Sequence, residues 1–262
     1  LATQIGKFQT QLSYTTKIKR PFYNQLSSNM RYMNRFTYMS GNPDLKPETI
    51  HDLTLSGSYK WLQFMISYQR EKDAILYITE QYKKNPAITT VTHRNFNRID
   101  NFSAFLTASP AVGSWHPQLT VGVQKQWAKI EHNGETLQMD TPLFFCTLNN
   151  GIQLPYHWTL STDINFQSKG DYQNIYMYQN VFMMNATLTK SFLNEHLSIH
   201  LQGIDLTHGR KDGNRIYNKH MNMDVANVSD SRELRFTIRY KFNTAKSKYK
   251  GKGAATEEIK RL

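Results

Sequence analysis

Apolar and polar residues alternate along the last regular segment of the chain, residues 233–242. The apolar side chains stand at its even positions: Leu234, Phe236, Ile238, Tyr240 and Phe242. Successive side chains of a β-strand point to opposite faces, so this segment predicts a strand with one apolar face and one polar face. Such a strand suits a soluble β-sandwich as well as a membrane β-barrel.

The same alternation returns along most of the chain. Further alternating segments cover residues 11–19, 52–59, 62–69, 118–127, 158–167, 176–192 and 197–202, and 176–192 is the longest expected strand. The polar partners are mostly Ser, Thr, Asn and Gln, which suit the wall of a water-filled lumen. Strands that cross a membrane need ~9–11 residues, whereas strands of soluble sandwiches usually have ~5–6. The lengths therefore favour a membrane barrel.

Long and short connections between these segments alternate. The short ones are residues 60–61, 154–157 and 193–196, with 108–117 slightly longer. The long polar ones are residues 20–48, 72–93, 131–140, 168–174 and 207–231. Bacterial outer-membrane barrels have short periplasmic turns and long external loops. The pattern predicts an all-β, antiparallel, up-and-down transmembrane β-barrel, of which this chain supplies about ten strands.

The composition agrees with a barrel and argues against membrane helices. Hydrophobic residues make up 39% of the chain, the mean hydropathy is -0.61, and no apolar run approaches the ~20 residues of a membrane helix. Aromatic residues reach 13%, and many stand near strand ends, where interfacial girdles form. The ordinary preference of aromatic residues for strands is the alternative explanation.

The net charge of +12 raises the question of nucleic-acid binding. Much of the positive charge lies in loops and at the end of the chain, and no recognition motif accompanies it. We expect residues 1–243 to form the barrel portion and residues 244–262 to form a basic, disordered periplasmic tail, with no nucleic-acid partner. The single cysteine, Cys146, permits no intrachain disulfide.

Two segments carry a resemblance to a known family. Residues 13–23, followed by residues 38–49, resemble the mid-barrel signature of TonB-dependent outer-membrane receptors, and residues 240–242 resemble the closing strand. The likeness is closest to the outer membrane protein β-barrel family and covers nearly the whole chain. The strongest part is the signature whose structural residues are Gly41, Asn42, Pro43, Leu45, Pro47 and Glu48. Gly and Asn permit tight bends there, and the prolines fix φ and lack a backbone donor.

The resemblance implies a location, a function and partners. The chain is expected to be the C-terminal part of a plugged barrel of ~22 strands in the outer membrane, since no signal peptide, TonB-contacting segment or plug is recognisable in it. The complete protein would import a small-molecule or oligomeric nutrient, such as an iron chelate, a glycan or a peptide, using energy delivered through TonB. Implied partners are outer-membrane lipid, the nutrient, TonB and a plug domain encoded upstream, and a surface lipoprotein.

Catalytic chemistry has little support in the sequence. His196 and His200 would lie ~13 Å apart on a strand, too far for one metal ion, and are interpreted as solvated lumen-facing residues. We therefore expect no enzyme activity, no metal and no cofactor. Candidate ligand-binding residues are Tyr77, Gln81 and Tyr82 in one long loop and Tyr172, Gln173 and Tyr176 near another. They could stack on and hydrogen-bond a sugar or an aromatic chelate, although exposed aromatic residues are also common in barrel loops.

Two other classes of protein remain open from the sequence. One is a structural, adhesive or passive outer-membrane barrel without TonB-driven import. The other is a soluble β-sandwich that acts as an enzyme or a binding module, which would leave the alternating connections unexplained. The sequence does not select a substrate.

Overall fold

The computed structural model describes residues 1–82, 85, 87–132, 134–217 and 222–242. Nearly all of the regular structure in this part of the chain is β-strand, and the short helix α1 (Tyr23–Leu26) is the exception. The predicted tail, residues 244–262, lies outside the described residues.

Two β-sheets make up the fold, and within the described residues their strand pairs are antiparallel except for the parallel pair of β4 and β7. The main sheet has 14 strands, most of them along the path β1-β2-β5-β6-β7-β8-β10-β11-β14-β15-β18. The strands of this path are β1 (Ala2–Ile5), β2 (Phe8–Lys19), β5 (Glu48–Tyr59), β6 (Leu62–Gln81), β7 (Thr89–Ala108), β8 (Trp115–His132), β10 (Leu143–Leu154), β11 (Trp158–Gln167), β14 (Val181–Phe192), β15 (Leu197–Ile204) and β18 (Glu233–Tyr240). The side strands are β3 (Arg31–Asn34), β4 (Thr37–Met39) and β9 (Glu135–Met139). A second sheet joins β12 (Gly170–Tyr172), β13 (Ile175–Met177), β16 (Lys211–Tyr217) and β17 (Asn222–Val228).

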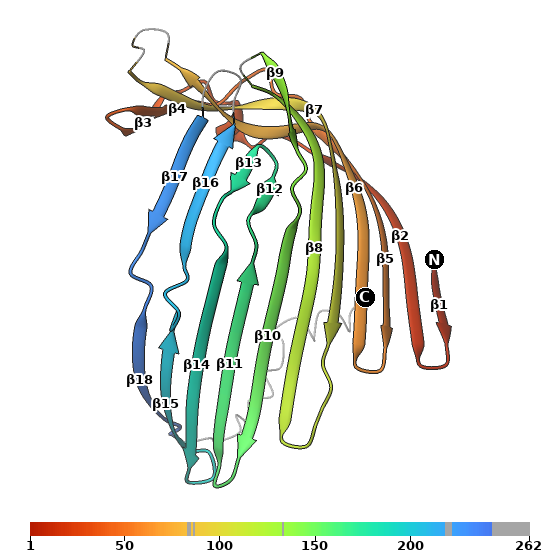
Figure 1. Ribbon diagram of the computed structural model, residues 1–262, viewed down its shortest axis with the longest axis vertical. Coiled ribbons are helices and arrows are strands. Elements are labelled where there is room, and N and C mark those ends of the chain that lie inside the picture. The colour runs from red at the N-terminus through yellow and green to blue at the C-terminus, as the bar shows by residue number, and fades with distance from the viewer. Residues whose placement is uncertain (83–84, 86, 133, 218–221, 243–262) are drawn as a thin grey trace, which may run out of the picture.

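The main sheet is a curved wall with different elements at its two ends (Figure 1). Tight turns join neighbouring strands at one end, and the long connections with their own strands occupy the other end. We call the second end the mouth; in an outer-membrane barrel it is expected to face the cell exterior. The predicted separation of long connections from tight turns is therefore confirmed, except at residues 72–93, which are described below.

The predicted number of strands also agrees with the structure. Along the path of the main sheet, ten strands in the described part of the chain have eight residues or more. The additional strand is β1, which is short and pairs with β2 at the edge of the sheet. Within the described residues β1 and β18 form the two edges and do not pair with each other, so the sheet is open.

Cross-strand pairing places the alternating residues on separate faces. Phe236 lies opposite Leu201 and Ile238 opposite Ile199, while Thr237 lies opposite His200 on the other face. His200 contacts the Thr189 hydroxyl at 3.0 Å, which continues the polar face across β14. His196 lies in the turn before β15, so the prediction of two histidines on one strand was wrong for it.

The predicted loop over residues 72–93 was wrong. β6 continues to Gln81 and β7 begins at Thr89, and the two strands stay paired over this whole stretch. The sequence suggested a loop because the apolar alternation of the membrane segment stops near Lys72. The strands persist because residues beyond Asp73 bury apolar side chains in the mouth, as described below.

The predicted strand over residues 176–192 is interrupted. Residues 175–177 belong to β13 in the second sheet, and β14 of the main sheet begins at Val181. The Tyr178 N–H donates to Gly213 O at 3.1 Å, and Asn180 Oδ1 accepts from the Lys169 N–H at 2.8 Å. These contacts turn the chain from one sheet to the other, although the alternation in sequence runs through the break.

The other four predicted loops also contain strands of their own. β3 and β4 lie within residues 20–48, β9 within 131–140, β12 within 168–174, and β16 and β17 within 207–231. These strands pair locally or with one another, so the mouth is a folded layer.

Candidate functional site at the mouth

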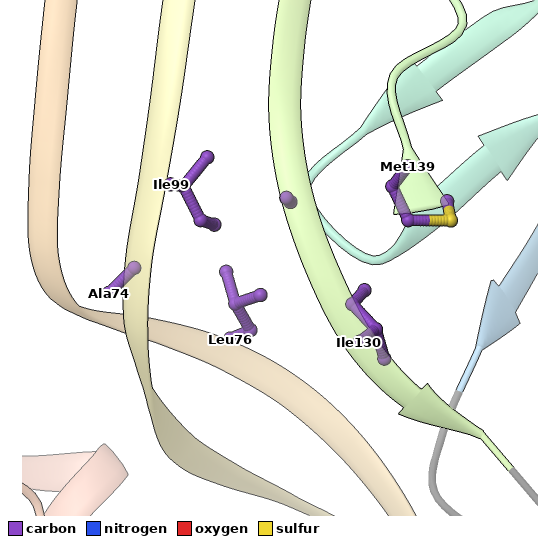
Figure 2. Close-up of a cluster of buried hydrophobic side chains, with 6 residues drawn as sticks. Ala74, Leu76, Ile99, Ile130 and Met139 are labelled. Carbon is purple, nitrogen blue, oxygen red and sulfur yellow. The ribbon is translucent and has the colours of Figure 1, made fainter. Parts of the chain in front are cut away.

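A buried apolar cluster forms the centre of the mouth (Figure 2). Its members come from β6, β7, β8 and β9 and are Ala74, Leu76, Ile99, Ala128, Ile130 and Met139. Leu76, Ile99 and Ile130 are almost completely buried, at 1%, 1% and 2% exposure. Burial of such side chains stabilises by roughly 1.5–3 kcal/mol each, which makes this cluster a rigid support for the residues around it.

The cluster requires β6 to change the face on which it carries apolar side chains. Ile66 and Tyr68 share the apolar face of the membrane segment, and strict alternation would put Leu76 on that face too. Leu76 instead packs with Ile99, which lies on the opposite face, in line with Asn101 and Ser103 on β7. Asp73 has a left-handed backbone (φ 55) and interrupts the pairing at this point. The change of face coincides with this left-handed residue.

The family signature anchors the segment between β4 and β5 to the mouth. The Gly41 N–H donates to Ser27 O at 2.8 Å, and the Asn42 N–H donates to Gln25 O at 2.6 Å. Asn42 also donates from its side-chain amide to His93 O on β7, at 3.1 Å. The two residues therefore connect helix α1 and its neighbours to the extension of β7.

The second half of the signature forms a turn and then starts β5. Asn42 Oδ1 accepts from the Asp44 N–H at 3.0 Å, so Pro43 lies in a tight turn closed by the asparagine side chain. Leu45 is buried, and Pro47 directly precedes the first residue of β5. The structural role of the signature residues stays a prediction, and these contacts are where it can be tested.

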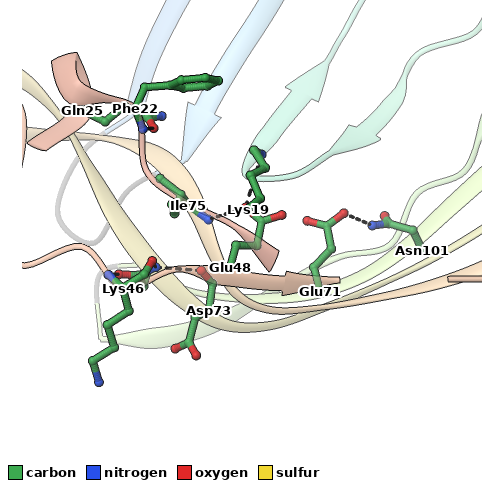
Figure 3. A network of polar contacts seen from close by, with 10 residues as sticks. Lys19, Phe22, Gln25, Lys46, Glu48, Glu71, Asp73, Ile75 and Asn101 are labelled. Atoms are coloured by element: carbon green, nitrogen blue, oxygen red, sulfur yellow. Dashed lines mark hydrogen bonds and ion pairs between the residues drawn. The ribbon is translucent and has the colours of Figure 1, made fainter. Parts of the chain in front are cut away.

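Asn95 and Glu48 complete the junction, and Figure 3 shows Glu48 beside Lys19 and Ile75. The Asn95 side-chain amide donates to Lys46 O at 3.0 Å and to Asp73 O at 2.7 Å, where β6 changes face. Glu48 is 2% exposed; its Oε2 lies 3.3 Å from Lys19 Nζ and accepts from the Ile75 N–H at 3.4 Å. The buried carboxylate thus joins β2, β5 and β6 where the wall meets the mouth.

The first group of predicted ligand-binding residues lies on and beside β6. Tyr77 is half-exposed, and its ring centroid lies 4.2 Å from that of His93. Gln81 is the exposed last residue of β6, and the Tyr82 ring meets Tyr38 edge to face at 5.5 Å. Burial lowers the pKa of His93, so the imidazole beside Tyr77 favours its neutral form.

The second predicted group lies in the hairpin between β12 and β13. Tyr172 is exposed, whereas Tyr176 packs against the buried cluster. Gln173 has a left-handed backbone, and both its N–H and its carbonyl group bond the side chain of Gln126, at 2.5 and 2.7 Å. Tyr176 and Gln173 thus have structural contacts, while Tyr172 is available at the surface.

Asn174 joins the two groups, and sequence reasoning missed it. Its side-chain amide donates to Tyr77 O at 2.7 Å and to Tyr217 O at 3.1 Å, and the residue is 1% exposed. The structure therefore brings β6, β13 and β16 together around one side chain. No periodicity in the sequence marks Asn174, because its partners are backbone atoms of distant segments.

Two buried aspartates hold other mouth segments. Asp171 accepts from the Thr141 N–H at 2.8 Å, and burial raises the pKa of this carboxyl. Asp205 accepts from the Gly209 and Arg210 N–H groups, at 2.8 and 3.2 Å, and from the Ser231 hydroxyl. Burial alone would raise the pKa of Asp205, but these donors stabilise the carboxylate and lower it.

The described residues contain neither a metal-binding group of side chains nor a membrane-spanning helix. No group of three or more His, Cys, Asp or Glu side chains there could hold a metal ion. In that same part of the chain, no helix is long and apolar enough to span a membrane.

A match to a protein-family model along nearly all of the described residues shows the family of the chain. Residues 2–240 match the model of the outer membrane protein β-barrel family. The chain belongs to this family. Its members are outer-membrane barrels, which fixes the location of the protein and makes the uncovered apolar face of the wall the lipid-facing one. Among curated protein sequences, none matches the chain.

Solved structures with the same fold are outer-membrane transporters and receptors. One is the transporter YddB from Escherichia coli, with a TM-score of 0.55 and 12% identity over 90% of this chain and 39% of YddB. Another is the siderophore receptor PirA from Pseudomonas aeruginosa, with a TM-score of 0.53 and 16% identity over 80% of this chain and 38% of PirA. A third is the ferric enterobactin receptor PfeA from the same organism, with a TM-score of 0.52 and 14% identity over 90% of this chain and 38% of PfeA. At these identities the likeness concerns the fold alone. The chain spans about two fifths of the length of each of these structures.

Proposed function

We propose that this chain is the C-terminal part of the barrel of a TonB-dependent receptor, which binds a nutrient at the cell surface and imports it across the outer membrane. Membership of the outer-membrane family and the similarity to receptor barrels support the proposal. The names of PirA and PfeA include a siderophore and ferric enterobactin, so an iron chelate is one candidate substrate beside a glycan or a peptide. The plug, TonB and a surface lipoprotein are the proposed partners.

The observation that carries the proposal is the joining of the two candidate binding segments by Asn174. Its bond to Tyr77 O spans 97 residues of sequence and its bond to Tyr217 O spans 43, so that β6, the hairpin of β12 and β13, and β16 are held in one folded layer. A binding surface needs side chains held in place by buried supports, and the apolar cluster supplies that support. A passive wall would not need its external connections to be tied together in this way.

Within this layer, the proposed ligand contacts are Gln81, Tyr82 and Tyr172, of which Gln81 and Tyr172 are exposed and Tyr82 is partly buried against Tyr38. Tyrosine rings can stack on a sugar or an aromatic chelate, and the glutamine amide can both donate and accept. Tyr77, Gln173 and Tyr176 are proposed to contribute mainly by shaping the surface: Tyr77 lies beside the His93 ring, Gln173 bonds the Gln126 side chain, and Tyr176 packs against the apolar cluster.

The experiment uses cells that lack the chromosomal gene and carry the complete protein on a plasmid. Candidate iron chelates, glycans and peptides are supplied one at a time as the growth-limiting nutrient, and uptake of the active one is measured. Tyr82→Ala and Tyr172→Ala are expected to weaken its binding, each by ~1–3 kcal/mol if the ring stacks on the ligand as rings stack on nucleic-acid bases. Tyr156→Ala is the matched control, since Tyr156 is exposed in a tight turn at the opposite end of the wall. Equal binding by all three variants and the wild type would contradict the proposed site.

The second candidate function is a structural, adhesive or passive barrel. The open, polar face along β14 and β15 suits a water-filled passage as well as contact with a plug. Uptake that needs neither TonB nor the membrane proton gradient would favour this candidate.

A further inference from the structure

Five cationic side chains gather on the lipid-facing side of the wall, at the mouth end of its apolar band. They belong to β6, β7 and β8 and are Arg70, Lys72, Arg98, Lys125 and Lys129, which we call the outer cation cluster. Pairing in the sheet fixes their side: Arg70 lies opposite Asp100, which lies opposite Trp127, and Lys72 lies opposite Arg98.

Apolar residues occupy the same face directly below the cluster. On β6, Ile66 and Tyr68 precede Arg70; on β8, Val121 and Val123 precede Lys125. Phe102 on β7 lies opposite Tyr68 and opposite Lys125. From one lipid-facing residue to the next, the face thus changes from apolar to cationic: Tyr68 is followed by Arg70 on β6, and Val123 by Lys125 on β8. Such a change is expected where the hydrocarbon core of a membrane meets its headgroups.

The cations outnumber the carboxylates around them. Asp100 accepts from Arg70 Nε at 2.8 Å and from Arg98 Nε at 2.5 Å, so one carboxylate serves two guanidinium groups. Asp140 lies 3.9 Å from Lys125 Nζ. Lys72 and Lys129 make no ion pair with any residue of the described part of the chain.

This excess of positive charge is unfavourable without a ligand. Like charges on directly opposite residues of neighbouring strands repel each other, as Lys72 and Arg98 do here. The lipid-facing residues at the mouth ends of β10, β11 and β14 are Phe144, Phe166 and Phe182 instead. The cluster is therefore a local feature of one side of the wall, and an anion beside it would relieve the repulsion.

Two hollows flank the paired guanidinium groups. One has a volume of about 470 Å³, and its lining includes Arg98, Trp127, Lys129 and Asp140. The other has a volume of about 390 Å³, and its lining includes Tyr14, Tyr68, Arg70 and Lys72. Each hollow combines cations with aromatic side chains, a combination suited to a headgroup that is charged at one end and attached to acyl chains at the other.

We propose that the outer cation cluster binds the phosphate group of a lipid in the outer leaflet, with the acyl chains lying along the apolar residues below it. The guanidinium groups of arginine and the ammonium groups of lysine both bind phosphate oxygens. The cluster lies on the lipid side of the wall and continues into the apolar band, which favours a membrane lipid over a soluble phosphate. The inference rests on the outer-membrane location and is independent of the proposed import.

The test compares lipid binding by two double variants of the intact protein, purified in detergent. K72Q/K129Q removes the two cations without an ion pair, and K7Q/K17Q removes the same charge from a tight turn and from the polar face of β2. Native mass spectrometry measures retention of phosphatidylglycerol and of phosphatidylcholine. We expect the wild type and K7Q/K17Q to prefer phosphatidylglycerol, and K72Q/K129Q to bind it more weakly by about fivefold for each lysine.

A charge-retaining variant and a competition with inorganic phosphate complete the test. K72R/K129R retains the charge and is expected to restore binding, which separates lost recognition from damaged folding. Inorganic phosphate is expected not to displace the lipid. Displacement by millimolar inorganic phosphate, equal retention of the two lipids by the wild type, or unchanged binding by K72Q/K129Q would each overturn the proposal.

Discussion

The side-chain amide of Asn174 donates to the carbonyl oxygen of Tyr77 at 2.7 Å, across 97 residues of sequence. The same amide donates to Tyr217 O at 3.1 Å. One buried side chain therefore holds β6 against the hairpin of β12 and β13 and against β16.

Replacing Asn174 with alanine is expected to loosen the mouth while leaving the wall folded. The change leaves two carbonyl oxygens without their donor in a buried place, at a cost of about 1–3 kcal/mol. Limited proteolysis of the complete protein in detergent measures the effect as faster cleavage within residues 168–217. Asn29→Ala is the control because Asn29 is exposed outside any strand, and cleavage of that variant at the wild-type rate is expected. Equal cleavage of all three proteins would show that Asn174 does not hold the layer together.

Replacing Gly41 with alanine is expected to disrupt the junction formed by the family signature. An added Cβ would lie 2.5 Å from Gln25 O and 2.6 Å from Ser27 O, both backbone atoms that cannot easily move. The overpacking should cost about 1–3 kcal/mol in the free energy of unfolding, which a detergent unfolding titration measures. Gly151→Ala is the matched control, since its Cβ would approach nothing closer than 3.9 Å. If both variants unfold alike, the close approach at Gly41 is not needed.

Arginine at Ile238 or Phe236 is expected to destabilise the barrel strongly. Both side chains lie on the lipid-facing side of β18, and a charge near the middle of the bilayer costs about 2–4 kcal/mol, so the larger effect is expected at Phe236; Ile238 lies level with Lys190, closer to the end with the tight turns. Thr237→Arg should be much milder because Thr237 lies beside His200 on the other face. Heat-modifiable mobility of the complete protein on gels compares the three variants. A Thr237→Arg effect as large as the Ile238→Arg effect would reverse the assignment of faces.

Residues 1–262 expressed alone are expected not to form a stable, uniform barrel. The main sheet has unpaired edges at β1 and β18 within the described residues, and closure of a barrel requires each edge to find a partner. Refolding into detergent micelles, followed by protease digestion and mass measurement, tests this. A monodisperse, protease-resistant monomer would show that these strands close on themselves and would contradict the larger barrel.

The sequence predicted the wall well and the mouth poorly, for a physical reason. In β18 and β15 every second residue faces lipid, so alternation in the sequence records the strand directly. Arg70 and Lys72 stand at positions that continue the apolar face and interrupt its pattern, and beyond Asp73 the strands carry their apolar residues on the other face. Residues 72–93 therefore resembled a loop in the sequence although they form a paired extension.

The candidate site could be predicted only in part. The six proposed ligand-binding residues were chosen for their chemistry within long connections, and the structure places both groups in the mouth. Asn174 and Gln126 could not be found in this way, because both bond backbone atoms of segments that are distant in sequence. The signature from Gly41 to Glu48 was recognisable because its glycine and prolines mark a tight turn, but its contact with Asn95 appears only in three dimensions.

Energy-dependent uptake tests the proposed function most directly. Cells that carry the complete protein are supplied with its labelled nutrient, and accumulation is compared with and without TonB. We expect accumulation to require TonB and to fall in the Tyr82→Ala and Tyr172→Ala variants, while surface binding by the wild type persists without TonB. Accumulation at the same rate in cells that lack TonB would contradict the account and would favour a passive barrel.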